Sequence, residues 1–417
     1  MMETSNTSAP GFSGIGYQLL KHACIGWDKI WEGLSCTLIS MYNTCLSLGH
    51  HPAIWKEASV TVIPKPDKPD YTGANAHHPI SLLETMSKLL EKIITKRMQH
   101  EIVAHELIPT NQFGGRMHSS CLDAGLTLLH IVQRAQQVNL KCGILLFDIK
   151  GFFDNVTHDR MVNIIRKLGY SHEIVNWTDS FLKERKVCLH FNGILSEQRD
   201  QLVGVPQGSP LSPVLSITYT SSLLHKMVRW NNSSLGIYVD DGILFACAPD
   251  WEGVETLLHA RYTVCKDWLR MLGLAIEPDK TEVMFFEKAR ECNTIPAPRH
   301  LLLPDREGST YYSVMPAETL RYLGFFFQRR QKWDHHITIM ANRARALIKA
   351  LSVLGNTICG LSMTNWRLVM NAVCLPVLTY RCQLWYREGG KGVKAHVNRL
   401  QCNRPRVLTC QCALVSL

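Results

Sequence analysis

Apolar residues recur along this chain in two patterns, which predict a protein that contains both strands and helices. Short β-prone runs occupy 58–63 and 143–147, and a longer one at 236–245 is interrupted by a polar turn. These runs have the length of single strands. In 82–94 and 161–168, apolar residues recur every three or four positions instead. That spacing places them on one face of a helix.

Local signals predict how several elements begin and pack. The Asn-Gly step at 192–193 predicts a hairpin turn. Ser81 and Glu84 have the spacing of a capping box, so we expect them to open the helix that follows. A further helix is expected over 121–138, and its core face is expected to hold Leu126, Leu129 and Val132.

The last quarter of the chain is much more basic than the rest. From Arg321 to the end there are 15 Lys and Arg residues against two acidic ones, whereas the first 320 residues have 30 basic and 33 acidic residues. This concentration suggests a surface that holds a polyanion, and a solvated basic face is the alternative. An amphipathic helix is expected here, with Arg343, Arg345 and Lys349 outward and Ala346, Leu347 and Leu351 packed inward.

Composition narrows the class of protein. With 46% apolar and 19% charged residues, the 417-residue chain has an ordinary globular composition. Its 15 cysteines show no paired spacing, which favours free thiols in a reducing compartment. The sequence contains neither a signal peptide nor an apolar run of the roughly 18 residues that a membrane span requires. We therefore expect an intracellular protein, in the nucleus or cytoplasm, that is neither secreted nor bound to a membrane.

Two adjacent carboxylates, Asp240 and Asp241, lie between the apolar halves of 236–245. The Asp241-Gly242 step predicts the positive φ of a tight hairpin turn. Because neighbouring carboxylates repel one another, the pair needs solvent or a cation to compensate it. The sequence leaves open whether this is a metal site or a plain surface turn.

A third carboxylate favours the metal site. The apolar run 143–147 ends in Asp148, where a strand gives way to a glycine turn. Asp148, Asp240 and Asp241 would together form an all-oxygen site for hard divalent cations. Two such ions about 3.5–4 Å apart can hold the attacking and leaving oxygens of a phosphoryl displacement.

Three motifs occur in an order that resembles reverse transcriptases. They are Phe-Asp-Ile-Lys-Gly-Phe-Phe-Asp at 147–154, Gly-Val-Pro-Gln-Gly-Ser-Pro-Leu-Ser-Pro at 204–213, and Tyr-Val-Asp-Asp at 238–241. The wording is most similar to non-LTR (LINE-like) retrotransposon enzymes, notably those of fungal genomes, and the resemblance extends over roughly residues 8–400. It identifies the chain as a fragment that holds the polymerase module.

The resemblance implies an α+β fold, the right-hand polymerase, with fingers, a palm built on a mainly antiparallel sheet, and a helical thumb. We expect an N-terminal extension and fingers at 1–135, a palm with a fingers insertion at 136–332, and a thumb with a truncated C-terminal extension at 333–417. The implied reaction is RNA-directed DNA synthesis, in which dNTPs are added to a DNA primer 3′-hydroxyl on an RNA template. Two Mg²⁺ ions on the three carboxylates would assist it, with an endonuclease acting in trans or lost.

The resemblance also assigns nucleotide contacts. Lys65 matches a lysine that faces the incoming triphosphate, and His78 stands where the family has an arginine. Histidine does not offer the bidentate fork of arginine to a phosphate, so the departure predicts weaker nucleotide binding. Phe153 matches the aromatic ring beneath the sugar that excludes a 2′-hydroxyl. The other expected nucleotide contacts are Gln207, Gly208 and Tyr238.

Two further assignments concern the leaving group and the primer. Lys280 matches a lysine beside the departing pyrophosphate, which an ammonium could protonate or stabilise. The family's primer-gripping hairpin is matched by Tyr322, Leu323 and Gly324. Asp154 is expected to cap the helix that follows it.

Two alternatives remain open. The chain could be an inactive retrotransposon relic, or a nucleic-acid-binding protein without catalysis that uses only its basic quarter. Zinc binding by His77 and His78 is disfavoured because adjacent strand residues point to opposite faces. The spacing of four residues in the tail fits no familiar zinc pattern; they are His396, Cys402, Cys410 and Cys412. The sequence does not indicate the oligomeric state.

Overall fold

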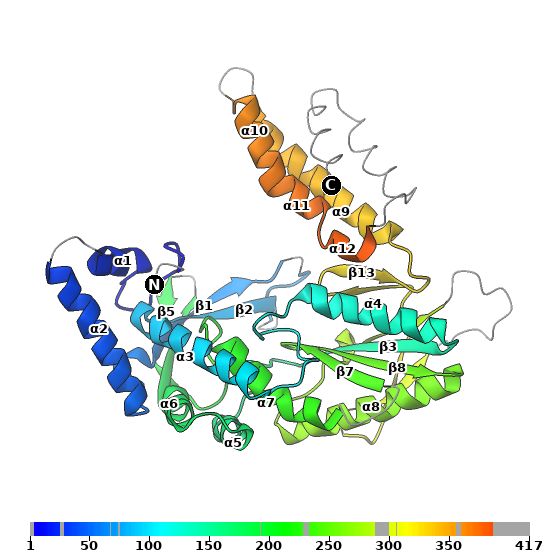
Figure 1. Cartoon of the computed structure of the whole chain (residues 1–417), viewed down its shortest axis with the longest axis horizontal. Coiled ribbons are helices and arrows are strands. Elements are labelled where there is room, and N and C mark those ends of the chain that lie inside the picture. The colour runs from blue at the N-terminus through cyan, green and yellow to red at the C-terminus, as the bar shows by residue number, and fades with distance from the viewer. Residues whose placement is uncertain are drawn as a thin grey trace.

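The computed structural model describes residues 4–25, 29–66, 68–73, 76–191, 193–227, 233–287, 300–305, 307–355 and 360–386. Two sheets form the body of the molecule, and two separate hairpins and a group of helices follow them (Figure 1). We call the sheet with strand order β7-β8-β3-β9 the central sheet, and the sheet with strand order β2-β1-β4-β5 the outer sheet. No helix in the described ranges is both long and apolar enough to cross a bilayer.

All the neighbouring strands of the central sheet run antiparallel. The strands are β3 (Lys141–Asp148), β7 (Ser233–Tyr238), β8 (Asp241–Ala248) and β9 (Glu282–Phe286). Helix α4 (Cys121–Gln137) covers one face, and α7 (Ser212–Met227) and α8 (Trp251–Met271) lie against the other (Figure 1). Leu145 and Phe147 of β3 therefore join one apolar cluster, while Ile144 and Leu146 join another. Because both faces are covered, the strand sequence is continuously apolar.

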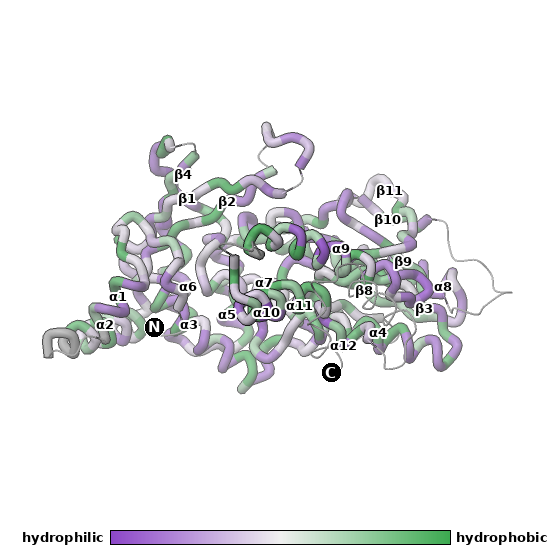
Figure 2. Tube along the Cα trace, turned by 90° about the horizontal axis from the view of Figure 1, so that it is seen from above, coloured by the Kyte–Doolittle hydropathy of each residue, from purple (hydrophilic) through white to green (hydrophobic). Residues whose placement is uncertain are grey.

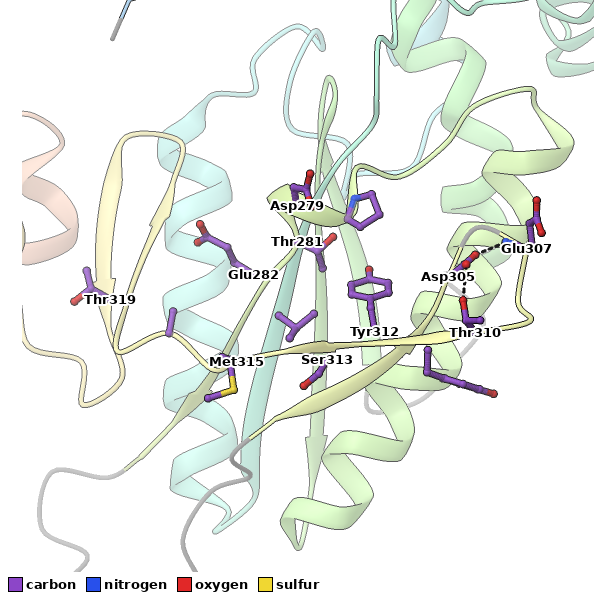
Figure 3. Close-up of a pocket in the computed structure, with 14 residues that line it drawn as sticks. Asp279, Thr281, Glu282, Asp305, Glu307, Thr310, Tyr312, Ser313, Met315 and Thr319 are labelled. Atoms are coloured by element: carbon purple, nitrogen blue, oxygen red, sulfur yellow. Dashed lines mark hydrogen bonds between the residues drawn. The ribbon is translucent and has the colours of Figure 1, made fainter. Parts of the chain in front are cut away.

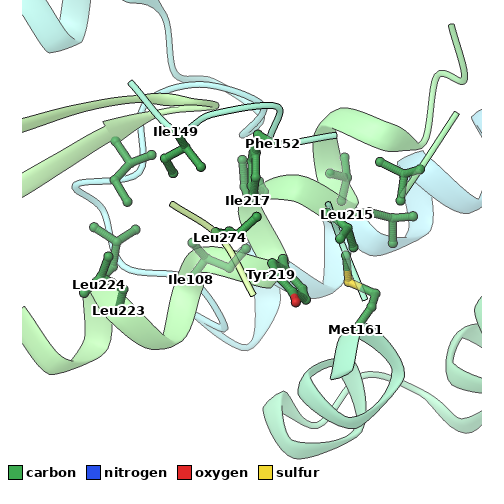
Figure 4. Packing of buried hydrophobic residues seen from close by; sticks show 14 of the residues in the cluster. Ile108, Ile149, Phe152, Met161, Leu215, Ile217, Tyr219, Leu223, Leu224 and Leu274 are labelled. Carbon is green, nitrogen blue, oxygen red and sulfur yellow. The ribbon is translucent and has the colours of Figure 1, made fainter. Parts of the chain in front are cut away.

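Beyond the end of β3, the chain enters the larger of the two clusters. Ile149 and Phe152, each 2% exposed, pack near Ile217, Tyr219 and Leu274 (Figure 4). Burial of each such side chain contributes about 1.5–3 kcal/mol to stability. The Tyr219 hydroxyl donates to the Leu272 carbonyl, so its polar atom is satisfied inside the core. Helices α5 (His158–Leu168) and α6 (His172–Leu182) complete this region.

The outer sheet joins segments that lie far apart in sequence. β1 (Glu57–Pro64) pairs antiparallel with β2 (His77–Leu82) and parallel with β4 (Arg185–Phe191). β4 also pairs with β5 (Ile194–Leu195) and β6 (Arg199–Gln201). In Figure 2, β1, β2 and β4 lie together and away from β3, β8 and β9. The helices on this side are α1 (Tyr17–Ile25), α2 (Lys29–Ser47) and α3 (Thr85–Ala104), with a 3₁₀ turn at Ala53–Trp55.

The C-terminal part consists of two hairpins and a helical projection (Figure 1). The hairpins are β10 (Leu301–Pro304) with β11 (Tyr311–Val314), and β12 (Thr319–Tyr322) with β13 (Phe325–Gln328). Helix α9 (Asp334–Leu351) is followed by a 3₁₀ turn at Ser352–Gly355 and by α10 (Met363–Val369). A π-helical turn at Met370–Cys374 connects α10 to α11 (Leu375–Leu378), and α12 (Cys382–Trp385) follows. The polar, Pro- and Arg-rich sequence of 291–310 favours a loop, but strand β10 forms within it, which corrects that prediction. Residues 291–299 and 306 lie outside the described residues.

Two sequence predictions about helices are wrong in detail. Ser81 lies in β2 rather than at a helix start, because its N–H donates to the Gln207 carbonyl at 2.6 Å. Glu84 instead accepts a hydrogen bond from the Ser13 N–H at 2.9 Å. Leu126 is 40% exposed, so it does not face the core. The buried stripe of α4 consists of Ala124, Gly125, Leu128, Val132 and Ala135.

Other predictions hold in the described part of the chain. The 192–193 hairpin is confirmed, since Phe191 pairs with Ile194 and Gly193 has a φ of +78°; Asn192 itself lies outside the described residues. The basic residues of α9 are exposed as predicted, but Ala346 is exposed too. The buried face of α9 holds His336, Ile337, Met340, Ala341 and Ala344. The four tail residues His396, Cys402, Cys410 and Cys412 lie outside the described residues.

Candidate active site

The register of the central sheet brings Asp148 and Asp241 together. The two residues are direct partners across β3 and β8. The next pair along the two strands, Ile149 and Asp240, is a hydrogen-bonded pair, because the Ile149 N–H donates to the Asp240 carbonyl at 3.1 Å. Because hydrogen-bonded and non-hydrogen-bonded pairs alternate, Asp148 and Asp241 form the closer kind, with Cα atoms about 4.5 Å apart. Two carboxylates from distant parts of the sequence thus share one face at the end of the sheet.

The hairpin turn does not lie where the sequence predicts it. Tyr238 pairs with Asp241, so the turn residues are Val239 and Asp240, and Val239 has a φ of +60°. A β-branched residue at positive φ is unusual and strained. Gly242 is required for another reason, because a Cβ there would lie 2.2 Å from the Phe147 ring. The prediction that Asp241-Gly242 supplies the positive φ is therefore wrong.

Burial and mutual repulsion act on these carboxylates. Burial raises the pKa of Asp241 to about 6, and the charges of Asp240 and Asp148 add to the rise. Burial also raises the pKa of Asp240, with the charge of Asp148 contributing. Lys280 Nζ lies 2.5 Å from Asp148 Oδ2. Burial would lower the pKa of Lys280, but the hydrogen bond and charge of Asp148 outweigh it and raise that pKa. The site thus concentrates negative charge that one ammonium partly compensates.

The donor set fits a hard divalent cation. Carboxylate oxygens held close together repel one another, and a bound divalent cation would relieve that repulsion. In the ranges that the structure describes, no three His, Cys, Asp or Glu side chains already surround a single point. Mg²⁺ itself needs few protein ligands, because it usually keeps several waters and takes further ligands from substrate phosphates.

The segment that holds Phe153 is hydrogen-bonded to the segment that holds Gln207. Phe153 is half-buried, whereas Phe152 is 2% exposed, and their ring centroids are 5.8 Å apart. The Val205 N–H donates to the Phe153 carbonyl at 2.7 Å. Gln207 Nε2 donates to Asp154 Oδ1 at 3.1 Å. Asp154 therefore anchors Gln207 rather than capping a helix. This corrects that prediction, since α5 begins at His158 and its N-cap is Thr157.

Gly208 approaches the outer sheet closely. Its φ is +126°, and a Cβ there would lie 2.5 Å from the Ser81 carbonyl oxygen. The strained backbone and the close contact both favour glycine. The neighbour that leaves no room for a side chain at Gly208 is the Ser81 carbonyl of the protein itself. Lys65 follows β1 and acts electrostatically on Asp154, so it belongs to the same region.

The two histidines of β2 have different surroundings. His78 is exposed and pairs across the strands with Ile63. His77 is half-buried, with its ring against those of Tyr71 and Phe191. The structure thus leaves His78 accessible at the position where an arginine is expected.

The predicted primer hairpin is formed by β12 and β13, with Leu323 and Gly324 at its turn. Both have positive φ, +49° and +84°. The Tyr380 hydroxyl donates to the Leu323 carbonyl at 3.2 Å. Tyr322 is only 2% exposed, and burial together with the charge of Asp241 raises its pKa. Tyr322 therefore packs behind the carboxylates, and half-buried Tyr238 lies in the same cluster.

Sequence reasoning missed a pocket of about 910 Å³ beside Lys280 (Figure 3). Asp279, Thr281 and Glu282 line it on one side, and the β10–β11 hairpin contributes Tyr312. Asp305 closes one end, where it accepts hydrogen bonds from Thr310 and from the Glu307 N–H, each at 2.6 Å. The spacing of these residues carries no motif, so the sequence held no signal for the pocket.

Several known proteins are similar to this chain. It is 27% identical over 381 residues to the probable RNA-directed DNA polymerase from transposon BS of Drosophila melanogaster. That alignment covers 89% of this chain and 40% of the relative. The chain is also 25% identical over 409 residues to the probable polymerase from transposon X-element of the same species, and this alignment covers 98% of the chain and 42% of the relative. The RNA-directed DNA polymerase from mobile element jockey of Drosophila melanogaster is 23% identical over 376 residues, and this alignment covers 89% of the chain and 39% of the relative. The chain thus spans about two fifths of the length of these relatives.

Solved structures of telomerase also align with the chain. Apo telomerase from Candida tropicalis gives a TM-score of 0.47 at 12% identity, covering 90% of this chain and 72% of that one. Residues 63–327 match the family described as reverse transcriptase (RNA-dependent DNA polymerase). This match confirms the predicted α+β right-hand polymerase fold. Because it spans more than half of the chain, the protein belongs to the reverse transcriptase family.

Proposed function

We propose that this chain is the RNA-directed DNA polymerase of a non-LTR retrotransposon and that it adds dNTPs to a primer 3′-hydroxyl. The observation that supports this most strongly is the pairing of Asp148 with Asp241, next to Asp240, at the open end of the central sheet. No sheet of purely structural purpose needs three acidic groups at one end, because their repulsion destabilises the fold.

The residues of the site have distinct roles in this proposal. Asp148, Asp240 and Asp241 hold two Mg²⁺ ions, which when bound activate the primer hydroxyl and stabilise the leaving pyrophosphate. Lys280, now paired with Asp148, stabilises or protonates the pyrophosphate as it departs. Phe153, with Tyr238, lies beneath the incoming nucleotide and excludes a 2′-hydroxyl by volume.

Binding of the substrates extends along the chain. Lys65 and His78 face the triphosphate, and Gln207 and Gly208 contact the nucleotide and templating base. The turn at Leu323 and Gly324, with Tyr322 behind it, grips the DNA primer. The exposed basic face of α9 holds the hybrid of primer and RNA template by its phosphates.

The finer predictions belong to this proposal as well. We place the N-terminal extension and fingers at 1–135, the palm with its fingers insertion at 136–332, and the thumb with its C-terminal extension at 333–417. We place the protein inside the cell, in the nucleus or cytoplasm. Kinship with fungal elements stays a prediction, which a phylogeny of reverse transcriptase sequences would test.

One observation favours a second candidate, an inactive relic of such an element. His78 is exposed at the position expected to hold arginine, and an imidazole cannot offer a phosphate the bidentate fork of a guanidinium. The loss of one charged hydrogen bond corresponds to about 1.5–3 kcal/mol. Nucleotide affinity would fall about tenfold or more as a result.

Primer extension on an RNA template with dNTPs and Mg²⁺ tests both candidates. We expect extension by the purified wild type, none by Asp240→Ala, and a lower dNTP KM for His78→Arg. Asp279→Ala is the matched control, because Asp279 is an exposed carboxylate beside Lys280 that no motif assigns. If only His78→Arg extends the primer, the chain is a relic inactivated at one phosphate contact. Absence of extension in all four proteins would refute the polymerase proposal.

A further inference from the structure

Glu91 is a fully buried carboxylate that connects two parts of the fold. It lies on α3 and has 0% exposure. Oε1 accepts a hydrogen bond from Ser87 Oγ, one helical turn away, at 2.5 Å. Oε2 accepts one from Ser209 Oγ, which lies 118 positions along the chain. A buried carboxylate is costly unless hydrogen bonds and a nearby positive charge compensate it.

The positive charge comes from Arg185 at the start of β4. Arg185 is 1% exposed, and its Nη1 donates to the Phe181 carbonyl at 3.2 Å. Its guanidinium lies 4.8 Å from the centroid of the Phe181 ring. Arg185 and Glu91 act on one another electrostatically, and Lys88 also acts on Glu91. The carboxylate is thus held by side chains from α3, β4 and the segment that contains Ser209.

That segment, residues 204–210, is fixed to both sheets. On the side of the central sheet, Val205 N–H donates to the Phe153 carbonyl at 2.7 Å. On the side of the outer sheet, the Gln207 carbonyl accepts from Ser81 N–H at 2.6 Å. Thr95, one turn beyond Glu91 on α3, donates to the Pro210 carbonyl at 3.2 Å. Two bonds of the segment have a carboxylate as acceptor, the one from Gln207 to Asp154 and the one from Ser209 to Glu91. Because bonds to a carboxylate are stronger than neutral ones, the bond from Ser209 should contribute most to the attachment of the segment to α3.

We propose that Glu91 is a positioning residue for nucleotide addition. Through Ser209 it fixes residues 204–210 against α3, and it thereby sets where Gln207 and Gly208 meet the nucleotide and the templating base. The inference rests on the proposed function for those two contacts. Glu91 itself touches neither substrate nor metal in this role.

Amide hydrogen exchange tests the positioning independently of activity. We expect faster exchange across 204–210 in Glu91→Gln and in Ser209→Ala, because both changes weaken the bond between α3 and the segment. Ser87→Ala is the matched control. It removes the hydroxyl that donates to the other oxygen of Glu91, and Ser87 lies on α3 rather than in the segment 204–210. Ser209→Thr keeps the hydroxyl and should exchange as the wild type does. Equal exchange across 204–210 in all of these proteins would overturn the inference, whether or not the wild type extends a primer.

Kinetics separate positioning from a general loss of folded protein. In single-nucleotide addition, Ser209→Ala and Glu91→Gln should raise the dNTP KM about tenfold with kcat changed less than about twofold. Ser87→Ala should leave KM unchanged. The double variant should be no worse than Ser209→Ala alone, because both changes interrupt one interaction. An equal fall in kcat in every variant, Ser87→Ala included, would show a merely structural role and overturn the proposal. A wild type that is silent in extension would instead count against the polymerase assignment.

Discussion

Replacing Asp241 with asparagine should make the metal-free protein more stable at neutral pH. The side chain keeps its size and loses a charge that is crowded by Asp148 and Asp240. The folded protein holds the Asp241 proton more tightly than the unfolded chain does, because burial and repulsion raise its pKa. Stability is therefore lost as the pH rises from about 4 to about 6, and the loss is complete above that range.

The magnitude follows from the pKa. A rise from 3.8 to about 6 corresponds to about 3 kcal/mol of lost stability at neutral pH. Since the side chain is partly exposed, screening by solvent reduces this to about 1–2 kcal/mol. Asp241→Asn should recover that amount at pH 8. Mg²⁺ should narrow the difference in stability between the variant and the wild type. At a concentration ten times its Kd, the bound ion stabilises the wild type by about 1.4 kcal/mol.

Urea unfolding, followed by tryptophan fluorescence in chelator-containing buffer at pH 4.5 and pH 8, measures the difference. We expect the variant to unfold at higher urea than the wild type at pH 8, and the difference between the two to shrink to about a third at pH 4.5. Asp279→Asn supplies the control, because the same chemical change at an exposed carboxylate should shift neither midpoint. An Asp241→Asn variant that is no more stable than the wild type at pH 8 would refute the reasoning.

Two further predictions concern Phe153 and Gly242. Phe153→Ala should raise the use of ribonucleotides relative to dNTPs by at least about tenfold in primer extension, because in the proposed function the ring is the bulk that blocks a 2′-hydroxyl. Gly242→Ala should destabilise the fold by about 1–3 kcal/mol in urea unfolding, because its Cβ would lie 2.2 Å from the Phe147 ring. Phe147→Leu in the same chain should restore part of that loss.

Each of these changes has a control within the chain. Phe152→Ala removes a fully packed ring, so it should lower stability without changing the choice of sugar; equal ribonucleotide use in both variants would contradict the role of Phe153. A Cβ at Gly73 would meet nothing within 4 Å, and Gly73→Ala should leave the unfolding midpoint unchanged. Strictly additive effects of Gly242→Ala and Phe147→Leu would contradict the steric explanation.

The sequence predicted where Asp148 and Asp241 lie in the sheet, at the end of β3 and the start of β8, because both end or interrupt strand-length apolar runs, a signal that is local. It failed at the turn, since Val239 adopts a positive φ that its side chain disfavours. It failed at Ser81 because pairing with the segment around Gln207 outweighs a local capping preference. Gly242 and Glu91 were missed for a related reason. Their partners, Phe147 and Ser209, lie far away in sequence, and no spacing rule connects them.

The register between β3 and β8 also has a consequence for how the protein folds. Asp148 and Asp241 are 93 positions apart, so the closure of a long loop must precede their meeting. A slip of one residue would turn Asp241 to the opposite face of the sheet. No local fragment of the chain can therefore assemble the three carboxylates. Divalent cations should act late in folding, by stabilising a sheet that is already paired rather than by nucleating it.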